Sequence, residues 1–332
     1  MEWARAVMKR FLPDLFVTLM VVSAVLGFFL PQLGASDGPL RLGLVTKLGI
    51  AFVFLLHGAN LAPENLVAGV KNWKVHVLIQ ITTFVMFPIL GLVIFFGLAP
   101  ILPESSRLGF FFLAALPSTI SSSVAMTVLA RGNVPVAVFN ATLSGLLGLV
   151  LTPIMISIVT AAGSLQFSLF DAIVNIALTL LAPFVVGQLV RPLIKQFLAN
   201  HKPVFSWVDR GVILLIVFTS FATSTAAGVW SRFTALEIFT TLALVLVLLG
   251  VAFGFTILAA RRLKLPREDE VAAVFCGSTK SLANGAPIAQ ILFAGSPVLG
   301  VILLPLMLYH QLQLICCALM AQRYAKQAEL AA

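Results

Sequence analysis

Long apolar stretches recur along the chain and are separated by short polar connections. Each stretch is long enough, as a helix rising about 1.5 Å per residue, to cross the roughly 30 Å hydrocarbon core of a bilayer. The pattern predicts an all-α integral membrane protein with ten transmembrane helices. The expected spans are residues 12–30, 44–62, 74–98, 107–130, 134–162, 168–192, 206–228, 235–260, 269–293 and 297–321.

Composition agrees with a membrane protein. Of the 332 residues, 60% are hydrophobic and 10% are charged, whereas soluble domains typically carry about 25% charged residues. The sequence contains no Cys/His metal-ligand spacing, no phosphate loop and no paired carboxylates inside a span, so neither an enzyme nor a cofactor or metal site is expected. No basic run is interleaved with aromatics, which excludes nucleic acid as a partner.

The basic residues predict the orientation in the membrane. Of the 21 Lys and Arg residues, 16 fall in the two terminal tails or in connections on the same side as them, 4 fall on the opposite side, and Lys280 falls inside a span. Cytoplasmic connections are enriched in Lys and Arg. We therefore expect a multi-pass protein of the cell inner membrane with both termini in the cytoplasm.

A short polar motif occurs twice, as STIS at 118–121 and STKS at 278–281. Shifting the first half of the chain by about 160 residues places its five spans on the last five. Because five is odd, the two copies enter the membrane from opposite sides, an arrangement known in secondary transporters. The sequence thus predicts two inverted five-helix repeats, residues 1–163 and 164–332.

Both copies of the motif lie in polar stretches at mid-membrane, where irregular backbone is tolerated only if it is buried or lines a cavity. The first stretch is LPSTISSSVAMT and the second is CGSTKSLANGAP. Isolated serines are often packing positions between membrane helices. Five hydroxyls within residues 118–123, with Gly, Pro and Lys at the symmetric place, instead favour discontinuous fourth and ninth helices that bind a ligand.

Lys280 lies ten residues after Glu270, which places it about 15 Å deep in the membrane. A lysine at that depth is costly and must face a cavity or a partner, as a functional residue or as a hydrogen-bonded structural one. No carboxylate lies at mid-membrane, so an anion from outside the chain is the expected partner. The candidate substrate-binding residues are Thr119, Ser121, Ser122, Ser278, Thr279, Lys280, Ser281, Asn284, His310 and Gln311.

These motifs resemble the bile acid:sodium symporter family over nearly the whole chain. The most specific match is LARGNV at 129–134, and GSTKSLANGAP and YHQLQ occupy the places of two further family motifs. The resemblance implies a panel domain of helices 1, 2, 6 and 7 and a core domain of helices 3–5 and 8–10. It also implies that the broken fourth and ninth helices cross at the substrate and sodium sites.

Several family sodium ligands are replaced in this chain. One ligand serine falls on Ser123, but the others fall on Val124, Ala137, Ala141, Ser278 and Leu282. The pattern resembles a divergent branch that contains bacterial carriers and eukaryotic relatives associated with calcium homeostasis. The resemblance therefore implies an altered or absent sodium site, with Ser123, Asn140, Thr142 and Lys280 as cation-binding or cation-replacing residues and sodium possible at Ser123 and Asn140.

The sequence thus predicts a secondary active transporter of a small organic anion, working by alternating access. Lys280 could supply the positive charge that sodium supplies elsewhere, or it could titrate and couple transport to protons. One alternative is a sodium-coupled symporter with a rearranged cation site. Another is a non-transporting membrane regulator of calcium handling.

Overall fold

The computed structural model describes residues 15–60, 72–161, 169–232 and 234–330, and these residues form helices and connections without any strand. Seven helical segments within the described ranges are long and apolar enough to cross a membrane. They are Leu42–Asn60, Trp73–Gly97, Val134–Thr160, Val174–Asn200, Lys202–Ala226, Leu236–Arg262 and Leu299–Leu330. The described residues are therefore all-helical, with helices of the length and composition that cross membranes; the ten crossings stay a prediction.

The described residues form a series of helices along the chain. Their bounds are α2 Leu15–Phe29, α3 Pro31–Gly34, α4 Leu42–Asn60, α6 Trp73–Ile81, η1 Thr82–Met86, α7 Phe87–Gly97, α8 Glu104–Ala115, α9 Ser121–Leu129, α10 Val134–Ala161, α11 Leu169–Ile176, η2 Ala177–Leu181, α12 Ala182–Asn200, α13 Lys202–Ala226, η3 Val229–Arg232, α14 Ala235–Arg262, α15 Arg267–Ser278, α16 Leu282–Leu292 and α17 Leu299–Leu330.

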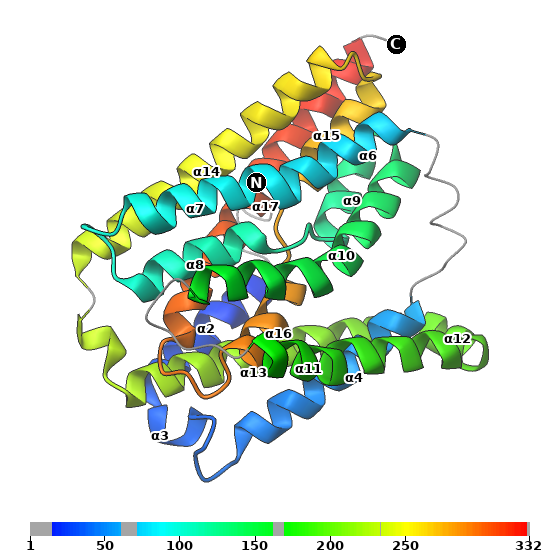
Figure 1. The fold of residues 1–332 in the computed structure, drawn as a ribbon. Coiled ribbons are helices and arrows are strands. Elements are labelled where there is room, and N and C mark those ends of the chain that lie inside the picture. The colour runs from blue at the N-terminus through cyan, green and yellow to red at the C-terminus, as the bar shows by residue number, and fades with distance from the viewer. Residues whose placement is uncertain (1–14, 61–71, 162–168, 233, 331–332) are drawn as a thin grey trace, which may run out of the picture.

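Two groups of helices lie against each other (Figure 1). The first group is α2, α3, α4, α12 and α13, in the lower half of the view. The second group is α6 to α10, α14, α15 and α17, in the upper half. Helix α16 lies between them, in contact with both α13 and α17.

Glycine allows the closest approach within the first group. A Cβ atom on Gly58 of α4 would overlap the carbonyl oxygen of Phe184 in α12, and one on Gly187 would overlap that of Leu55. Small residues permit such backbone contact between membrane helices, where van der Waals packing drives association. The amide of Gln188 adds a 2.6 Å hydrogen bond to the Gly58 carbonyl.

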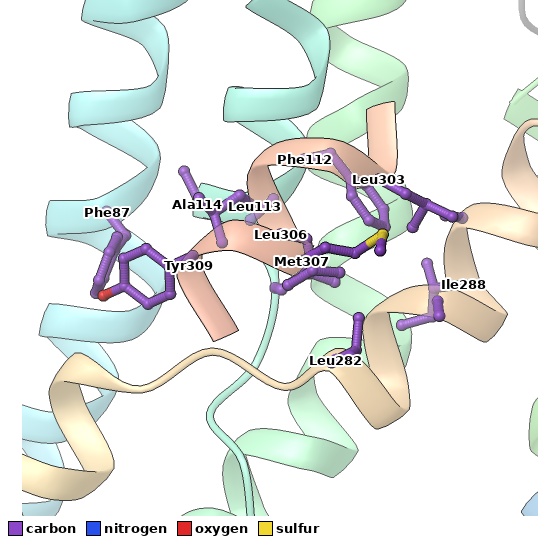
Figure 2. Close-up of a cluster of buried hydrophobic side chains, with 14 of the residues drawn as sticks. Phe87, Phe112, Leu113, Ala114, Leu282, Ile288, Leu303, Leu306, Met307 and Tyr309 are labelled. Atoms are coloured by element: carbon purple, nitrogen blue, oxygen red, sulfur yellow. The ribbon is translucent and has the colours of Figure 1, made fainter. Parts of the chain in front are cut away.

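Two helices are interrupted. Helix α8 ends at Ala115, the chain is extended at Leu116, and α9 begins only at Ser121. Helix α15 ends at Ser278, Thr279 is extended, and α16 begins after Ser281. The polar motifs therefore fall at helix breaks, as predicted from their hydroxyl, glycine and proline content. The apolar core packs directly against these breaks (Figure 2).

The LARGNV motif forms the turn between α9 and α10. Arg131 has a positive φ of 56°, and a Cβ atom on Gly132 would overlap Val271 of α15. Asn133 accepts a hydrogen bond from the Val136 amide and donates one of 2.7 Å to Asp269. The motif thus fixes the start of α10 against the start of α15.

Candidate transport site at the crossing of two broken helices

The two breaks touch. Ser118 Oγ lies 3.1 Å from Thr279 Oγ1, and the Ser281 amide donates a 2.9 Å hydrogen bond to the Pro117 carbonyl. The Ser118 amide donates to Ser144 Oγ on α10 at 2.9 Å. The residues of the STIS and STKS motifs, 160 positions apart in the sequence, therefore meet in space.

The Lys280 side chain crosses from one break to the other. It is fully buried, and its Nζ donates to the carbonyl oxygens of Thr83, Ala114 and Leu116 at 3.0, 2.8 and 2.7 Å. An ammonium has three donors, so all of them are used within the protein. The same Nζ lies 4.1 Å from the centre of the Phe87 ring, a cation–π arrangement.

These three carbonyls are available because regular helix is lost nearby. Ala114 and Leu116 lie at the C-terminal end of α8, where carbonyls have no intrahelical partner and the helix dipole is negative. Thr83 lies in the π-helical turn η1, just before Pro88, which has no N–H to donate. The ammonium therefore caps a half-helix and joins it to the π-turn, as a bound cation would.

The second break is held by side chains of α17. Gln313 accepts a 2.7 Å hydrogen bond from the Lys280 amide and donates one of 2.9 Å to the Lys280 carbonyl. The Tyr309 hydroxyl donates to the Ser278 carbonyl at 2.6 Å. Figure 2 shows the Tyr309 ring beside that of Phe87. The centres of the two rings lie 6.1 Å apart. The backbone around Lys280 is thus fixed as well as its side chain.

A cavity of about 460 Å³ lies between the two helix groups. The crossing contributes residues at the starts of α9 and α16, and α4, α12 and α13 form the opposite wall. Polar lining residues from the second group and α16 are Thr119, Ser121, Thr142, Ser281 and Asn284; those from the first group are His57, Asn60, Lys202, Ser206 and Asp209. Phe54, Leu146, Leu149, Phe184 and Phe205 are among the apolar ones. The volume suits a small organic ligand.

A family model described as the SBF-like CPA transporter family matches residues 14–326. The chain belongs to this family. A Pseudomonas aeruginosa protein named "Uncharacterized protein PA2026" is 44% identical over 97% of this chain and 96% of its own length. "Putative symporter YfeH" of Escherichia coli is 39% identical, with 95% and 94% covered. "Sodium/bile acid cotransporter 7" of Rattus norvegicus is 29% identical, with 93% and 91% covered.

Membership of the SBF-like CPA transporter family confirms the resemblance to the bile acid:sodium symporters. The chain is a membrane transporter rather than an enzyme, because the family and its named relatives are transporters and symporters. The substrate, the coupling ion and the site residues stay predictions, and the structure shows where the residues lie.

In this family member the predicted substrate-binding residues fall into three places. Thr119, Ser121, Ser281 and Asn284 line the cavity. Ser278, Thr279 and Lys280 lie behind it, fully or almost fully buried, and the hydroxyls of Ser278 and Thr279 bond to carbonyls of their own helix. Ser122, His310 and Gln311 are partly buried and do not line the cavity.

The predicted cation residues are dispersed. Ser123 donates to the Thr119 carbonyl, and Thr142 lines the cavity. Asn140 faces α6. Its side-chain Nδ2 lies 2.8 Å from His76 Nδ1, and its side-chain Oδ1 accepts a 3.3 Å hydrogen bond from Gln80 Nε2. Of the four predicted residues, Lys280 most resembles a bound cation, because its ammonium lies among three carbonyl oxygens.

Several residues of the site were not predicted. His57 and Asp209, which line the cavity, were not among the predicted site residues. Gln313 and Tyr309 were not assigned to Lys280. No sequence signal connects α4 to α13 or the break to α17, because these contacts join residues far apart in the chain. The YHQLQ run alone marked a polar segment of α17.

Proposed function

We propose that the protein is a secondary carrier of small organic anions that works by alternating access. In this proposal the chain makes ten crossings in two inverted repeats. The first helix group, with α11, acts as the panel domain, and the second group with α16 acts as the core domain. The observation that supports it best is the cavity that lies between the groups and is lined by the first residues of both α9 and α16.

The starts of α9 and α16 suit an anion. Backbone N–H groups and the positive end of the helix dipole favour negative charge, and Ser121, Ser281 and Asn284 add hydroxyl and amide groups. The Ser281 hydroxyl caps α16 by accepting a 3.1 Å hydrogen bond from the backbone N–H of Asn284. Apolar side chains from both groups would cover the rest of the ligand. The proposed substrate is therefore amphipathic, with a carboxylate or sulfonate at one end.

The cavity would face the cytoplasm in this structure. Its lining includes Asn60, Lys202 and Asp209, which lie at the cytoplasmic ends of their helices if the distribution of Lys and Arg sets the orientation. On the side away from the cytoplasm the two helix groups are in contact. There the backbone amide of Gly300 in α17 donates a 3.1 Å hydrogen bond to Ser224 Oγ in α13. Movement of one group against the other would open that side.

Lys280 would replace the coupling cation of related symporters. Its ammonium occupies a position coordinated by three carbonyl oxygens at the crossing, so the half-helices need no sodium to hold them together. Its donors are all used within the protein, which favours this role over direct contact with the substrate.

The test is counterflow of radiolabelled octanoate into proteoliposomes in sodium-free buffer. We expect saturable uptake by the wild type and a loss of at least about tenfold in Asn284→Leu, which keeps the side-chain size but removes the amide. Ser231→Ala, at an exposed site outside the cavity, is the matched control. Absence of saturable uptake would favour the non-transporting regulator, and uptake only with sodium would favour the sodium-coupled symporter.

A further inference from the structure

We infer that the cavity selects a dipolar substrate, with the anionic group at the crossing and a hydrogen-bond-donating or cationic group bound by Asp209 on the opposite wall. This inference rests on the proposed function and narrows its substrate class to amphipathic ω-hydroxy or ω-amino acids and the corresponding sulfonates.

Asp209 presents a carboxylate to the cavity. Its Oδ1 is buried and faces His57, whose Nε2 lies 3.4 Å away, and 27% of the Asp209 side chain is exposed. Both residues line the cavity. The exposed part of the Asp209 carboxylate can accept a hydrogen bond from a ligand in the cavity, and a bond to a charged acceptor is stronger than one to a neutral acceptor.

The two walls of the cavity differ in charge. The core wall is formed by α9, α10 and α16, and the panel wall by α4, α12 and α13. The core wall presents helix N-termini and uncharged polar side chains. The panel wall presents the Asp209 carboxylate, with His57 from α4 and Lys202 from the start of α13 as the other titratable lining residues. The Lys202 side chain is exposed, and no ion pair joins it to Asp209 among the described residues. An anion that reached Asp209 without a donor would meet a like charge.

The space between the walls is apolar. Phe54 and Phe184 come from the panel side, and Leu146 and Leu149 come from α10 on the core side. A methylene chain or ring of the substrate would pack against these apolar side chains. Polar groups in the middle of the substrate would lose their hydrogen bonds with water there. The geometry therefore favours polar groups at the two ends of the substrate and an apolar middle.

The experiment compares three probes of equal chain length: octanoate, 8-hydroxyoctanoate and 8-aminooctanoate. Binding to the purified full chain is measured by calorimetry and by thermal stabilisation. We expect the wild type to bind 8-aminooctanoate about tenfold more tightly than octanoate, because a hydrogen bond to a charged partner is gained, with 8-hydroxyoctanoate between them. Asp209→Asn should lose the preference for the amine and bind octanoate at least as well as the wild type.

Two further variants keep the test decisive. Asp209→Glu keeps the carboxylate and should keep the preference even if Asp209→Asn folds poorly. Asp37→Asn, at an exposed site outside the cavity, should match the wild type. Equal binding of all three probes would overturn the inference and leave the proposed function intact, as would a preference that survives in Asp209→Asn. Failure of every probe to bind would overturn both.

Discussion

Replacing Lys280 tests whether an ammonium holds the crossing together. Lys280→Met keeps most of the side-chain length but removes three hydrogen bonds, to the carbonyls of Thr83, Ala114 and Leu116, and the contact with Phe87. Each buried carbonyl left without a donor costs about 1–3 kcal/mol. The removal of a buried charge offsets part of this sum, so we expect a net loss of about 3–5 kcal/mol, at the lower end of the total for three unsatisfied carbonyls.

The response to sodium distinguishes loss of the ammonium from a simple loss of packing at position 280. Lys280→Ala leaves space beside three carbonyl oxygens, the kind of ligand that hard cations prefer. Sodium at ten times its dissociation constant would restore about 1.4 kcal/mol, whereas the wild type, whose site is filled by the ammonium, should not respond.

The assay is thermal unfolding of the purified protein in sodium or choline chloride. At about 2–4 °C per kcal/mol, the Lys280→Met variant should unfold at least about 6 °C below the wild type. Lys326→Met, at an exposed site, controls for loss of a lysine. The reasoning is refuted if Lys280→Met is as stable as the wild type, or if sodium stabilises the wild type as much as it stabilises Lys280→Ala.

Three other substitutions test the packing around the site, each by thermal unfolding. Gln313→Leu should cost about 2–3 kcal/mol, because two buried backbone groups of Lys280 lose their partners. A cost below about 0.5 kcal/mol would show that these two hydrogen bonds do not stabilise the fold. Gly58→Val should prevent the approach of α4 to α12, since its Cβ overlaps the Phe184 carbonyl, and normal stability would contradict that packing. Asn133→Ala should cost about 1–3 kcal/mol, because it loses the hydrogen bonds to Val136 and Asp269. Asp269→Asn should also destabilise the protein. If it costs less than Asp37→Asn, a substitution at an exposed site, the hydrogen bond between Asn133 and Asp269 contributes no stability.

The sequence predicted where the helices break, because the determinants are local. Hydroxyls, Pro117 and Lys280 in apolar surroundings cannot form an ordinary lipid-facing helix, and the structure interrupts α8–α9 and α15–α16 at those residues. The match between STIS and STKS predicted an inverted repeat, and the family resemblance implied that the two broken helices cross. Ser118 and Thr279 from these motifs lie 3.1 Å apart.

The partners of Lys280 could not be predicted in the same way. A lysine without a nearby carboxylate suggested an anion from outside, but the structure satisfies its ammonium with backbone carbonyls. Those carbonyls become available only through the end of α8 and the π-turn at Thr83, and neither is visible in a hydropathy pattern. The panel wall was missed for a similar reason, since Asp209 and His57 meet only through the packing of α4 against α13.

The most direct test of alternating access is the labelling of a single cysteine at position 283, which lines the cavity. Ala283→Cys is made in a chain whose three native cysteines are replaced by alanine, and a membrane-impermeant thiol reagent is applied to inside-out and to right-side-out vesicles. The account predicts fast labelling from the cytoplasmic side, slower labelling from the opposite side, and protection by octanoate on both. Labelling from one side only, or from neither, would contradict a site that opens alternately to the two sides of the membrane.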